Sequence, residues 1–481
     1  MRSQVLFDGI TGIRDDLVEN AKTARQKKSR IRWIGAVAAV LVVAVFAGIL
    51  LRPETSPILA AHAIAVAEYP TMAPYPDESK YFNETTQDSE GFSRAHDAWW
   101  ESIKAQRRDT GYEEGLEDFL TRSTQEFLSG KAGENVVYSP LNVYMALAML
   151  AETVDGEGRQ QVLSLLGAES LDALRSQAND LWNANYRQDS ATSSVLAASL
   201  WLDQDIAYKQ AAMDDLANYY YASSYQGDMG SAEFNKALQQ WLNDQTGGLL
   251  EEQAAQIEMT PETVLSLAAT IYFKSKWRTE FSERFTETGV FHAADGDVET
   301  DFMHQRDSQN YYWGENFAAI SRGLESGGRM WFLLPDEGVT AESLMADPEA
   351  MEFILQDVGW ENSKFLKVNQ SIPKFDVVSQ LDLKPGLQAL GITDVFSAEA
   401  ADFSPILVNP RGAALSKIQH DARVAIDEEG VTAAAYTVMM MAGATEPPAE
   451  EVDFVLDRPF LFAITGANSL PLFVGVVNQP Q

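Results

Sequence analysis

One stretch of this sequence, residues 426–442, limits the possible folds more than any other. An acidic turn that ends in Gly430 is followed by small and apolar residues, and residues 431–442 contain neither charge nor proline. Such a run can form an inner strand, because no side chain or missing N–H prevents its pairing. It ends in GATEPP at 443–448, a composition typical of an exposed loop tip where proteases cut. The sequence therefore predicts a protease-accessible segment that is also able to join a sheet.

This stretch resembles the hinge and reactive loop of the serpin family, and the resemblance extends over residues 115–481. Eight segments match family motifs in order and spacing: NVVYSPL (135–141), WLNDQTGG (241–248), IYFKSKW (271–277), PKF (373–375), LGI (390–392), ADFS (401–404), RPFLF (458–462) and FVGVVN (473–478). One such motif alone would be weak, but eight in order are specific. The resemblance implies an α+β serpin fold with a large, mainly antiparallel central sheet, two smaller sheets, about eight or nine helices and an exposed reactive loop.

Helical and strand-like patterns are segregated along the chain, which favours α+β over alternating βαβ units. Ser139 followed by Pro140 is typical of a helix start, and that helix is expected to run through Ala151. Further helices are expected around 159–166, 169–184, 206–222 and 231–245, and strands at 194–203, 265–273, 328–335, 365–380, 422–427, 452–456, 460–466 and 471–477.

The N-terminal region predicts a membrane anchor. Residues 33–51 are nineteen consecutive uncharged, mostly apolar residues, which is enough to cross a bilayer as one helix. Residues 22–32 hold six basic residues and no acidic one, so the positive-inside rule places the N-terminus in the cytoplasm. We therefore expect a cytoplasmic segment (1–32), a transmembrane helix (33–51), an extracytoplasmic linker or stalk (52–114) and an extracellular serpin domain (115–481) at the cell membrane. The alternative is a cleaved signal peptide, because Ala60, Ala61, Ala63 and Ala65 are small residues that a signal peptidase accepts.

Composition excludes several function classes. The chain has no cysteine, which excludes disulfides, thiolate metal sites and a cysteine nucleophile. Its net charge of −34 repels nucleic acid. The five histidines form no HExxH, and no GxSxG, GxxxxGK[ST] or GxGxxG motif is present. We therefore expect no enzyme activity, no metal and no cofactor. The signal-anchor layout and the absence of cysteine favour a bacterial source, and we expect a monomer.

The resemblance implies a suicide-type inhibitor. In the family, a serine or cysteine protease attacks the loop and forms an acyl-enzyme, and the loop then inserts into the main sheet and distorts the protease. The hinge comprises Glu428, Glu429, Gly430, Val431, Thr432, Ala433, Ala434 and Ala435. Strand side chains alternate between faces, so Val431, Ala433 and Ala435 share the inward face and are small enough to insert. The alternative is a non-inhibitory binding or sensor domain displayed on the membrane.

The scissile bond is expected between Ala444 and Thr445. Counting fourteen residues from Gly430, the usual family spacing, reaches Ala444. An alanine there suits an elastase-like or subtilisin-like serine protease with a shallow apolar pocket. A loop one residue longer would move the bond to Thr445–Glu446, and cleavage at Met441–Ala442 or a neighbouring bond would instead point to chymotrypsin-like enzymes.

Four further residues match the family cluster that controls sheet opening and loop insertion: Ser139, Asn142, His420 and Trp277. Ala269 stands where the family usually has an asparagine, and Asn142 where it usually has a serine. We therefore expect the amide of Asn142 to bond His420 in place of the missing strand asparagine. Trp277 matches the family tryptophan next to the place where the loop enters the sheet.

Overall fold

The computed structural model describes residues 56–480, apart from positions 84–85, 107–115, 132, 190, 356–359, 411, 432–447 and 449. The cytoplasmic segment expected at 1–32 and the transmembrane helix expected at 33–51 lie outside the described residues. Within the part of the chain that is described, no helix is both long and apolar enough to cross a bilayer.

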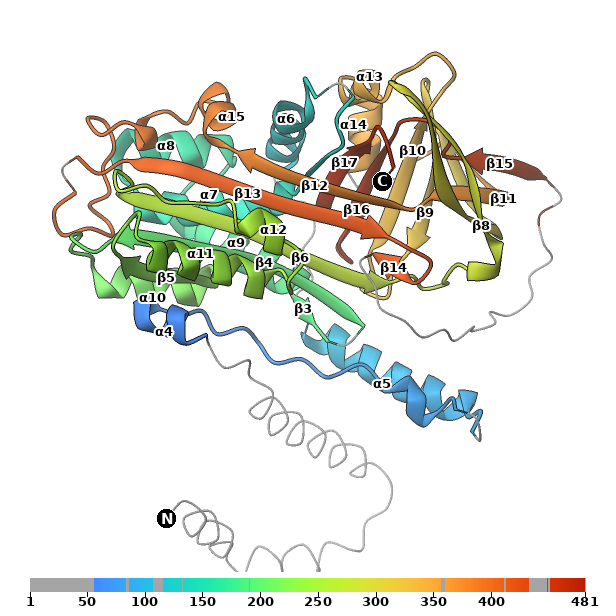
Figure 1. The fold of residues 1–481 in the computed structure, drawn as a ribbon, viewed down its shortest axis with the longest axis horizontal. Helices are drawn as coiled ribbons and strands as arrows, with labels where there is room; N and C mark the ends of the chain where they lie inside the picture. The colour runs from blue at the N-terminus through green and yellow to red at the C-terminus, as the bar shows by residue number, and fades with distance from the viewer. Residues whose placement is uncertain are drawn as a thin grey trace, which may run out of the picture. The chain divides into compact units, whose positions relative to one another are not determined.

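An eight-stranded sheet, here called the main sheet, forms one half of the fold (Figure 1). Its strands run in the order β1 (Ala63–Ala65), β5 (Ala222–Gly227), β4 (Thr192–Asp203), β6 (Leu265–Lys276), β14 (Gly430–Val431), β13 (Leu415–Ile426) and β12 (Phe375–Asp382), with β3 (Arg187–Gln188) paired to β4. The pairs β4–β5 and β6–β13 are parallel and the others antiparallel, so the main sheet is mainly antiparallel as expected.

The remaining strands form a second sheet. Its order is β15 (Glu451–Val455), β11 (Ser363–Pro373), β8 (Gly296–Trp313), β9 (Phe317–Gly323), β10 (Arg329–Pro335), β16 (Phe460–Thr465), β17 (Pro471–Val477) and β2 (Val136–Tyr138), with β7 (Thr286–Ala293) paired to β8. The resemblance had implied two smaller sheets here. They are joined into one because β8 runs for 18 residues and pairs with β7, β11 and β9 along its length.

Helices pack on both sheets. They are α4 (Pro57–His62), α5 (Ser89–Gln106), α6 (Leu116–Leu128), α7 (Pro140–Thr153), α8 (Gly156–Leu165), α9 (Leu171–Asn185), α10 (Gln210–Tyr219), α11 (Ala232–Gln245), α12 (Glu251–Ala254), α13 (Ala341–Met345), α14 (Pro348–Leu355) and α15 (Lys384–Ala389). Within the described part of 115–481 there are ten α-helices rather than eight or nine, because α12, α13 and α15 are short elements of four to six residues.

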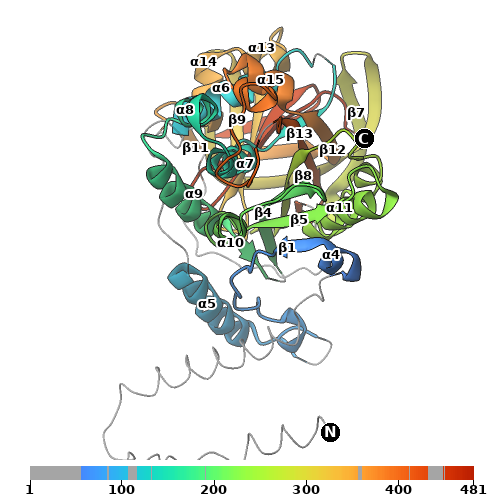
Figure 2. The same cartoon turned by 90° about the vertical axis from the view of Figure 1, so that its left-hand side faces the viewer.

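Helix α7 occupies the centre of the fold, with α8 and α9 on the same side of the main sheet and α11 on the other (Figure 2). It starts where Ser139 caps it and Pro140 occupies its first turn, as the sequence predicted. Almost all of its side chains are buried, because it packs on β4, β6 and β17 and carries no charged side chain before its last turn. This position brings the start of α7 against the strands that must separate if the main sheet is to open.

The chain before α6 differs from the expected linker at 52–114. Its described residues belong to the same compact unit as the sheets. Strand β1 adds to the free edge of β5, pairing Ala63 with Tyr225 and Ala65 with Ser224, and α4 packs on α11. Helix α5 buries Phe92, Trp99 and Ile103. A stalk was expected from the five prolines between Pro53 and Pro76, but the apolar residues among and after them provide enough surface for docking.

Candidate functional site

The hinge begins with a tight turn at the end of β13. The Asp427 carboxylate accepts hydrogen bonds from the backbone N–H groups of Glu429 (2.9 Å) and Gly430 (3.1 Å). An aspartate in this position closes the turn onto its own backbone, so the chain reverses directly after the strand. Burial raises the pKa of the Asp427 carboxyl. The turn thus places Gly430 and Val431 in the main sheet as β14.

Strand β14 lies between β13 and β6. Val431 pairs with Ile426 on β13 and with Ser275 on β6, while Gly430 pairs with Lys276. A Cβ atom added at Gly430 would lie 2.3 Å from the carbonyl oxygen of Ser275, so this close approach requires glycine. Val431 is buried in the hydrophobic core. The first two residues that would enter the sheet during loop insertion are therefore already seated in it.

Next to β14, strands β6 and β13 of the main sheet no longer pair directly with each other. Strands β6 and β13 pair directly and in parallel only from Leu265 and Leu415 to Thr270 and Asp421. Farther along β6, the pairing on this side is with β14. Among the described residues, no ladder pair joins residues 271–274 of β6 to β13. A strand that continued β14 between them would gain hydrogen bonds on both sides.

Trp277 holds the hinge turn through two hydrogen bonds. Its backbone N–H donates to the carbonyl of Glu429 (2.9 Å), and its indole Nε1–H donates to the carbonyl of Asp427 (2.8 Å). The guanidinium of Arg322 lies 5.5 Å from the Trp277 ring and 3.9 Å from the ring of Phe281. Trp277 is buried and directly follows β6, so it ties the hinge to the strand along which the loop would insert.

The two adjacent hinge glutamates lie in opposite environments. Glu428 accepts hydrogen bonds from Lys374 (2.8 Å) and Thr286 (2.6 Å). Burial opposes its ionisation, but these bonds outweigh burial and lower the pKa of Glu428. Burial raises the pKa of Glu429, and its Oε2 has no hydrogen-bond partner among the described residues. Glu428 therefore anchors the turn, whereas the Glu429 carboxylate is incompletely satisfied.

Ser139, Asn142 and His420 meet between α7 and β13. The backbone N–H of Ser139 donates to Nε2 of His420 (3.1 Å), and Ser139 Oγ accepts from the backbone N–H of Asn142 (3.4 Å). The prediction that Asn142 bonds His420 is wrong for this structure, because Asn142 Nδ2 donates to the carbonyl of Thr270 (3.1 Å). The Nε2 atom of His420 already has a donor in Ser139. Trp277, which we grouped with these residues, lies at the hinge instead.

His420 and its neighbour Asp421 are buried ionisable groups at the end of the direct β6–β13 pairing. Burial lowers the pKa of His420 to about 3, and burial raises the pKa of Asp421 to about 6. The Asp421 carboxylate accepts a hydrogen bond from Gln419 (2.8 Å), and the Asp421 carbonyl accepts one from Thr270 (3.3 Å). Sequence reasoning missed Asp421. Asp421 shares its face of β13 with Lys417 and Arg423, which are not buried, so the alternation gave no signal for a buried carboxylate there.

The remaining site predictions lie outside the described residues. These are the hinge residues Thr432, Ala433, Ala434 and Ala435 and the scissile residues Ala444 and Thr445. Val431 lies in the main sheet and Glu451 begins β15 of the second sheet, so residues 432–450 connect the two sheets. Across the described ranges, no group of three or more His, Asp or Glu side chains is arranged to hold a metal ion.

Comparison with known families and curated proteins identifies relatives of this chain. The family model described as Serpin (serine protease inhibitor) matches residues 114–480. Serpin-ZXA of Oryza sativa subsp. japonica is 31% identical over 372 residues, which cover 73% of this chain and 92% of that protein. Serpin-ZX of Arabidopsis thaliana is 29% identical over 368 residues, which cover 72% of this chain and 92% of that protein.

Solved structures show the same fold. The thermophilic serpin Tengpin in its native state has a TM-score of 0.69 at 24% identity, with 78% of this chain and 98% of that chain covered. The Arabidopsis protein AtSerpin1 in its native stressed conformation has a TM-score of 0.62 at 25% identity, with 77% of this chain and 100% of that chain covered.

Proposed function

The chain belongs to the serpin family of serine protease inhibitors and is not an enzyme, and on this premise we propose that it is an irreversible, suicide-type inhibitor of extracellular serine proteases. One observation carries the proposal: Gly430 and Val431 already lie between β6 and β13, beside a stretch of β6 without a ladder partner on β13. A main sheet that accepts the first two residues of the loop offers a continuous path for the rest.

The proposed mechanism uses stored free energy. A target protease attacks the loop and forms an acyl-enzyme, and the freed loop extends β14 as a new strand between β6 and β13. Each added residue replaces solvated backbone groups with ladder hydrogen bonds, so insertion is favourable once the loop is cut. Val431 faces the core, and alternation places Ala433 and Ala435 on the same face. Because these side chains are small, insertion meets no steric barrier there.

The proposed targets are elastase-like or subtilisin-like proteases, cut at Ala444–Thr445. Trypsin-like enzymes require Lys or Arg, and residues 430–449 contain neither. Cysteine proteases remain a second partner class, because the trap depends on an acyl-enzyme rather than on a hydroxyl nucleophile. The competing function is a non-inhibitory binding or sensor domain, in which the loop is never inserted.

We also propose that residues 33–51 anchor the protein in the cell membrane, with the N-terminus cytoplasmic and the inhibitor domain extracellular. The length of the apolar run and the basic residues before it support this topology. The bacterial origin, the monomeric state and the lack of nucleic-acid binding stay predictions from the sequence. Alkaline extraction of membranes and N-terminal sequencing of the retained protein would separate an intact anchor from a cleaved signal peptide.

The decisive experiment incubates the full chain, kept in mild detergent, with elastase, subtilisin and trypsin. We expect a complex with elastase or subtilisin that survives denaturing electrophoresis, and a released peptide that begins at Thr445 by mass spectrometry. The matched variant Ala444→Arg is expected to transfer complex formation to trypsin. Cleavage without a complex, and without a rise in thermal stability of the cleaved protein, would establish the non-inhibitory alternative.

A further inference from the structure

Residues 57–106, here called the N-terminal arm, run along the main sheet from its edge to the hinge end of β6. The arm starts with α4 on α11, continues through β1 on the edge of β5, and ends in α5 next to β3 (Figure 1). Its contacts at the hinge end involve buried charges rather than solvent-exposed ion pairs. The function assigned to the sheets does not explain these contacts.

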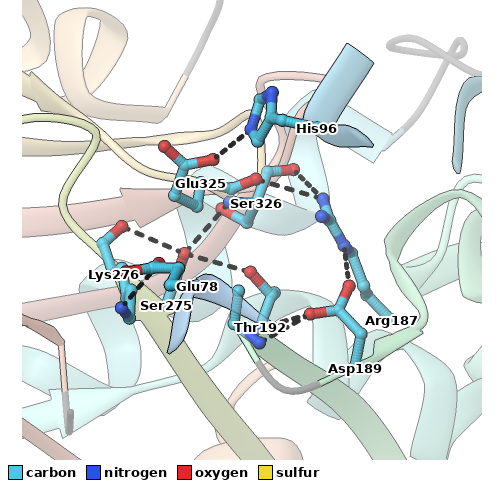
Figure 3. Close-up of polar contacts among 10 residues, drawn as sticks. Glu78, His96, Arg187, Asp189, Thr192, Ser275, Lys276, Glu325 and Ser326 are labelled. Atoms are coloured by element: carbon cyan, nitrogen blue, oxygen red, sulfur yellow. Dashed lines mark hydrogen bonds and ion pairs between the residues drawn. The ribbon is translucent and has the colours of Figure 1, made fainter. Parts of the chain in front are cut away.

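Helix α5 packs on a buried arginine. The guanidinium of Arg187 lies 4.7 Å from the ring of Trp99, which in turn packs edge-on against Tyr75 of the arm. Arg187 is 3% exposed and pairs with Asp189 at 3.0 Å. It also donates hydrogen bonds to the backbone carbonyls at 325 and 326 (3.2 and 3.1 Å), as Figure 3 shows. A desolvated cation held in this way makes the contact with Trp99 specific.

A hydrogen bond and an ion pair add to this contact (Figure 3). His96 Nε2 lies 3.4 Å from a carboxylate oxygen of Glu325, and Glu78 Oε1 lies 3.3 Å from Nζ of Lys276. The four side chains are 12–17% exposed, so solvent screens the pairs less than it screens surface pairs. Glu325 belongs to the turn between β9 and β10 of the second sheet. The arm therefore binds both sheets at once.

The groups bound by the arm are those that receive the hinge. Lys276 pairs with Gly430, and its neighbour Ser275 pairs with Val431. Ser275 Oγ accepts the backbone N–H of Ser326 (3.0 Å), and the carbonyl of Lys276 accepts the backbone N–H at 325 (3.0 Å). The positive charge of Lys276 also acts on the hinge carboxylate of Glu429. Glu78 thus holds the side chain of the same lysine whose backbone pairs with the hinge.

We propose that the N-terminal arm is a built-in latch that slows insertion of the reactive loop, with Glu78 and Trp99 as its main contacts. Insertion requires β6 to separate from β13, and β6 is joined to β4 along its full length. Any shift of this group of strands against the second sheet strains the contacts that α5 makes with both. The arm therefore stabilises the uninserted state, and a partner that withdrew the arm would activate insertion.

This inference rests on the proposed function, so its test measures insertion without a protease. The probe is a fluorescent synthetic peptide with the sequence of residues 431–443, which can anneal into the main sheet of the uncleaved full chain. Annealing is followed by native electrophoresis for the wild type, Glu78→Gln and Trp99→Ala. The control is Glu90→Gln, because Glu90 lies on α5 with Trp99 but forms a highly exposed ion pair with Arg94.

We expect annealing at least fivefold faster in Glu78→Gln and Trp99→Ala and within twofold of wild type in Glu90→Gln. Equal rates in all four proteins would overturn the latch while leaving the inhibitor proposal intact. The unfolding midpoint of the loop-cleaved form is measured in parallel. If Glu78→Gln and Trp99→Ala lower the midpoint of the cleaved form as much as that of the uncleaved form, the arm is a general stabiliser and the latch is refuted. A wild type that neither anneals the peptide nor gains stability on cleavage overturns the proposed function and the latch together.

Discussion

The backbone N–H of Ser139 donates a hydrogen bond of 3.1 Å to Nε2 of His420 and so joins the start of α7 to β13. Because Nε2 accepts, the proton of the neutral imidazole lies on Nδ1. That atom is buried and has no hydrogen-bond partner among the described residues. A charged imidazolium would need a second acceptor here, so the contact works only while His420 is neutral.

His420 is therefore expected to make stability depend on pH. Its folded pKa, about 3, lies below the ordinary value of 6.5, so between these values the unfolded chain binds a proton that the folded chain does not. This contribution is complete above pH 6.5 and is lost as pH falls, with a slope of about 1.4 kcal/mol per pH unit. The free energy of unfolding is measured with urea and tryptophan fluorescence. Between pH 6 and pH 4 the wild type should lose stability relative to His420→Gln by about 1.4 kcal/mol per pH unit.

Asp421 is expected to act in the opposite direction. Its folded pKa, about 6, lies above the ordinary value of 3.8, so the folded chain retains the proton in this interval. Its contribution is fully present below pH 3.8 and is lost as pH rises to 6, again by about 1.4 kcal/mol per pH unit. As pH rises from 4 to 6, the free energy of unfolding of Asp421→Asn should therefore increase relative to that of the wild type. Unfolding curves that stay parallel to those of the wild type in both variants would refute these assignments.

Asn142→Ala is expected to weaken the contact between α7 and β6. The change removes the hydrogen bond to the Thr270 carbonyl and leaves that buried acceptor without its side-chain donor, which costs about 1–3 kcal/mol. The urea midpoint at pH 7 measures the loss. Gln240→Ala is the control, since Gln240 bonds Asp244 on the exposed face of α11, and a change below about 0.5 kcal/mol is expected. Equal effects in the two variants would contradict a special role for Asn142.

Ala433→Arg is expected to convert the inhibitor into a substrate. Val431 is buried in β14, and position 433 falls on the same face of a continued strand, where a charged side chain would enter the core. Position 434 falls on the opposite face, so Ala434→Arg is the matched control. Elastase should cleave Ala433→Arg without a stable complex or a gain in thermal stability, and should still be trapped by Ala434→Arg. The reverse result would place the alternation in the other register.

Trp277→Phe is expected to loosen the hinge turn. It removes the indole N–H that donates to the Asp427 carbonyl but keeps an aromatic ring and the backbone bond to Glu429. Loss of about 1 kcal/mol should raise hydrogen exchange of the amides at 429 and 430 roughly fivefold, as read from peptides spanning 424–431. In Trp360→Phe the lost donor served the Trp313 carbonyl of the second sheet, so hinge exchange should not change.

Local patterns predicted several elements well. The start of α7 followed from Ser139 and Pro140, and the apolar run at 265–273 became β6. The single strand expected at 365–380 is interrupted at Lys374, whose backbone N–H bonds the Asp301 carbonyl of β8, so β11 and β12 belong to different sheets. That division depends on a distant strand, which no local pattern reveals.

Other elements had no local signal. Strand β8 is the longest of the described strands but carries many charged and polar side chains, because much of it is solvent-exposed. The arm was interpreted as a linker because its prolines suggested an extended chain, whereas its docking depends on distant partners such as Arg187 and Tyr225. Asn142 was placed in the right cluster but with the wrong partner, since its acceptor is a backbone carbonyl and not a side chain.

The three residues of β1 affect how readily molecules of this protein associate with one another. A sheet edge is a row of unsatisfied backbone groups, and a loop that can become a strand is a ready match for such an edge on another molecule. By pairing Ala63 and Ala65 with β5, each molecule covers part of its own edge with a segment from the same chain. That segment is present at a high effective concentration whatever the protein concentration, so a neighbour's loop must displace it before joining the sheet there. A high protein concentration therefore favours self-association less than it would if this edge were uncovered.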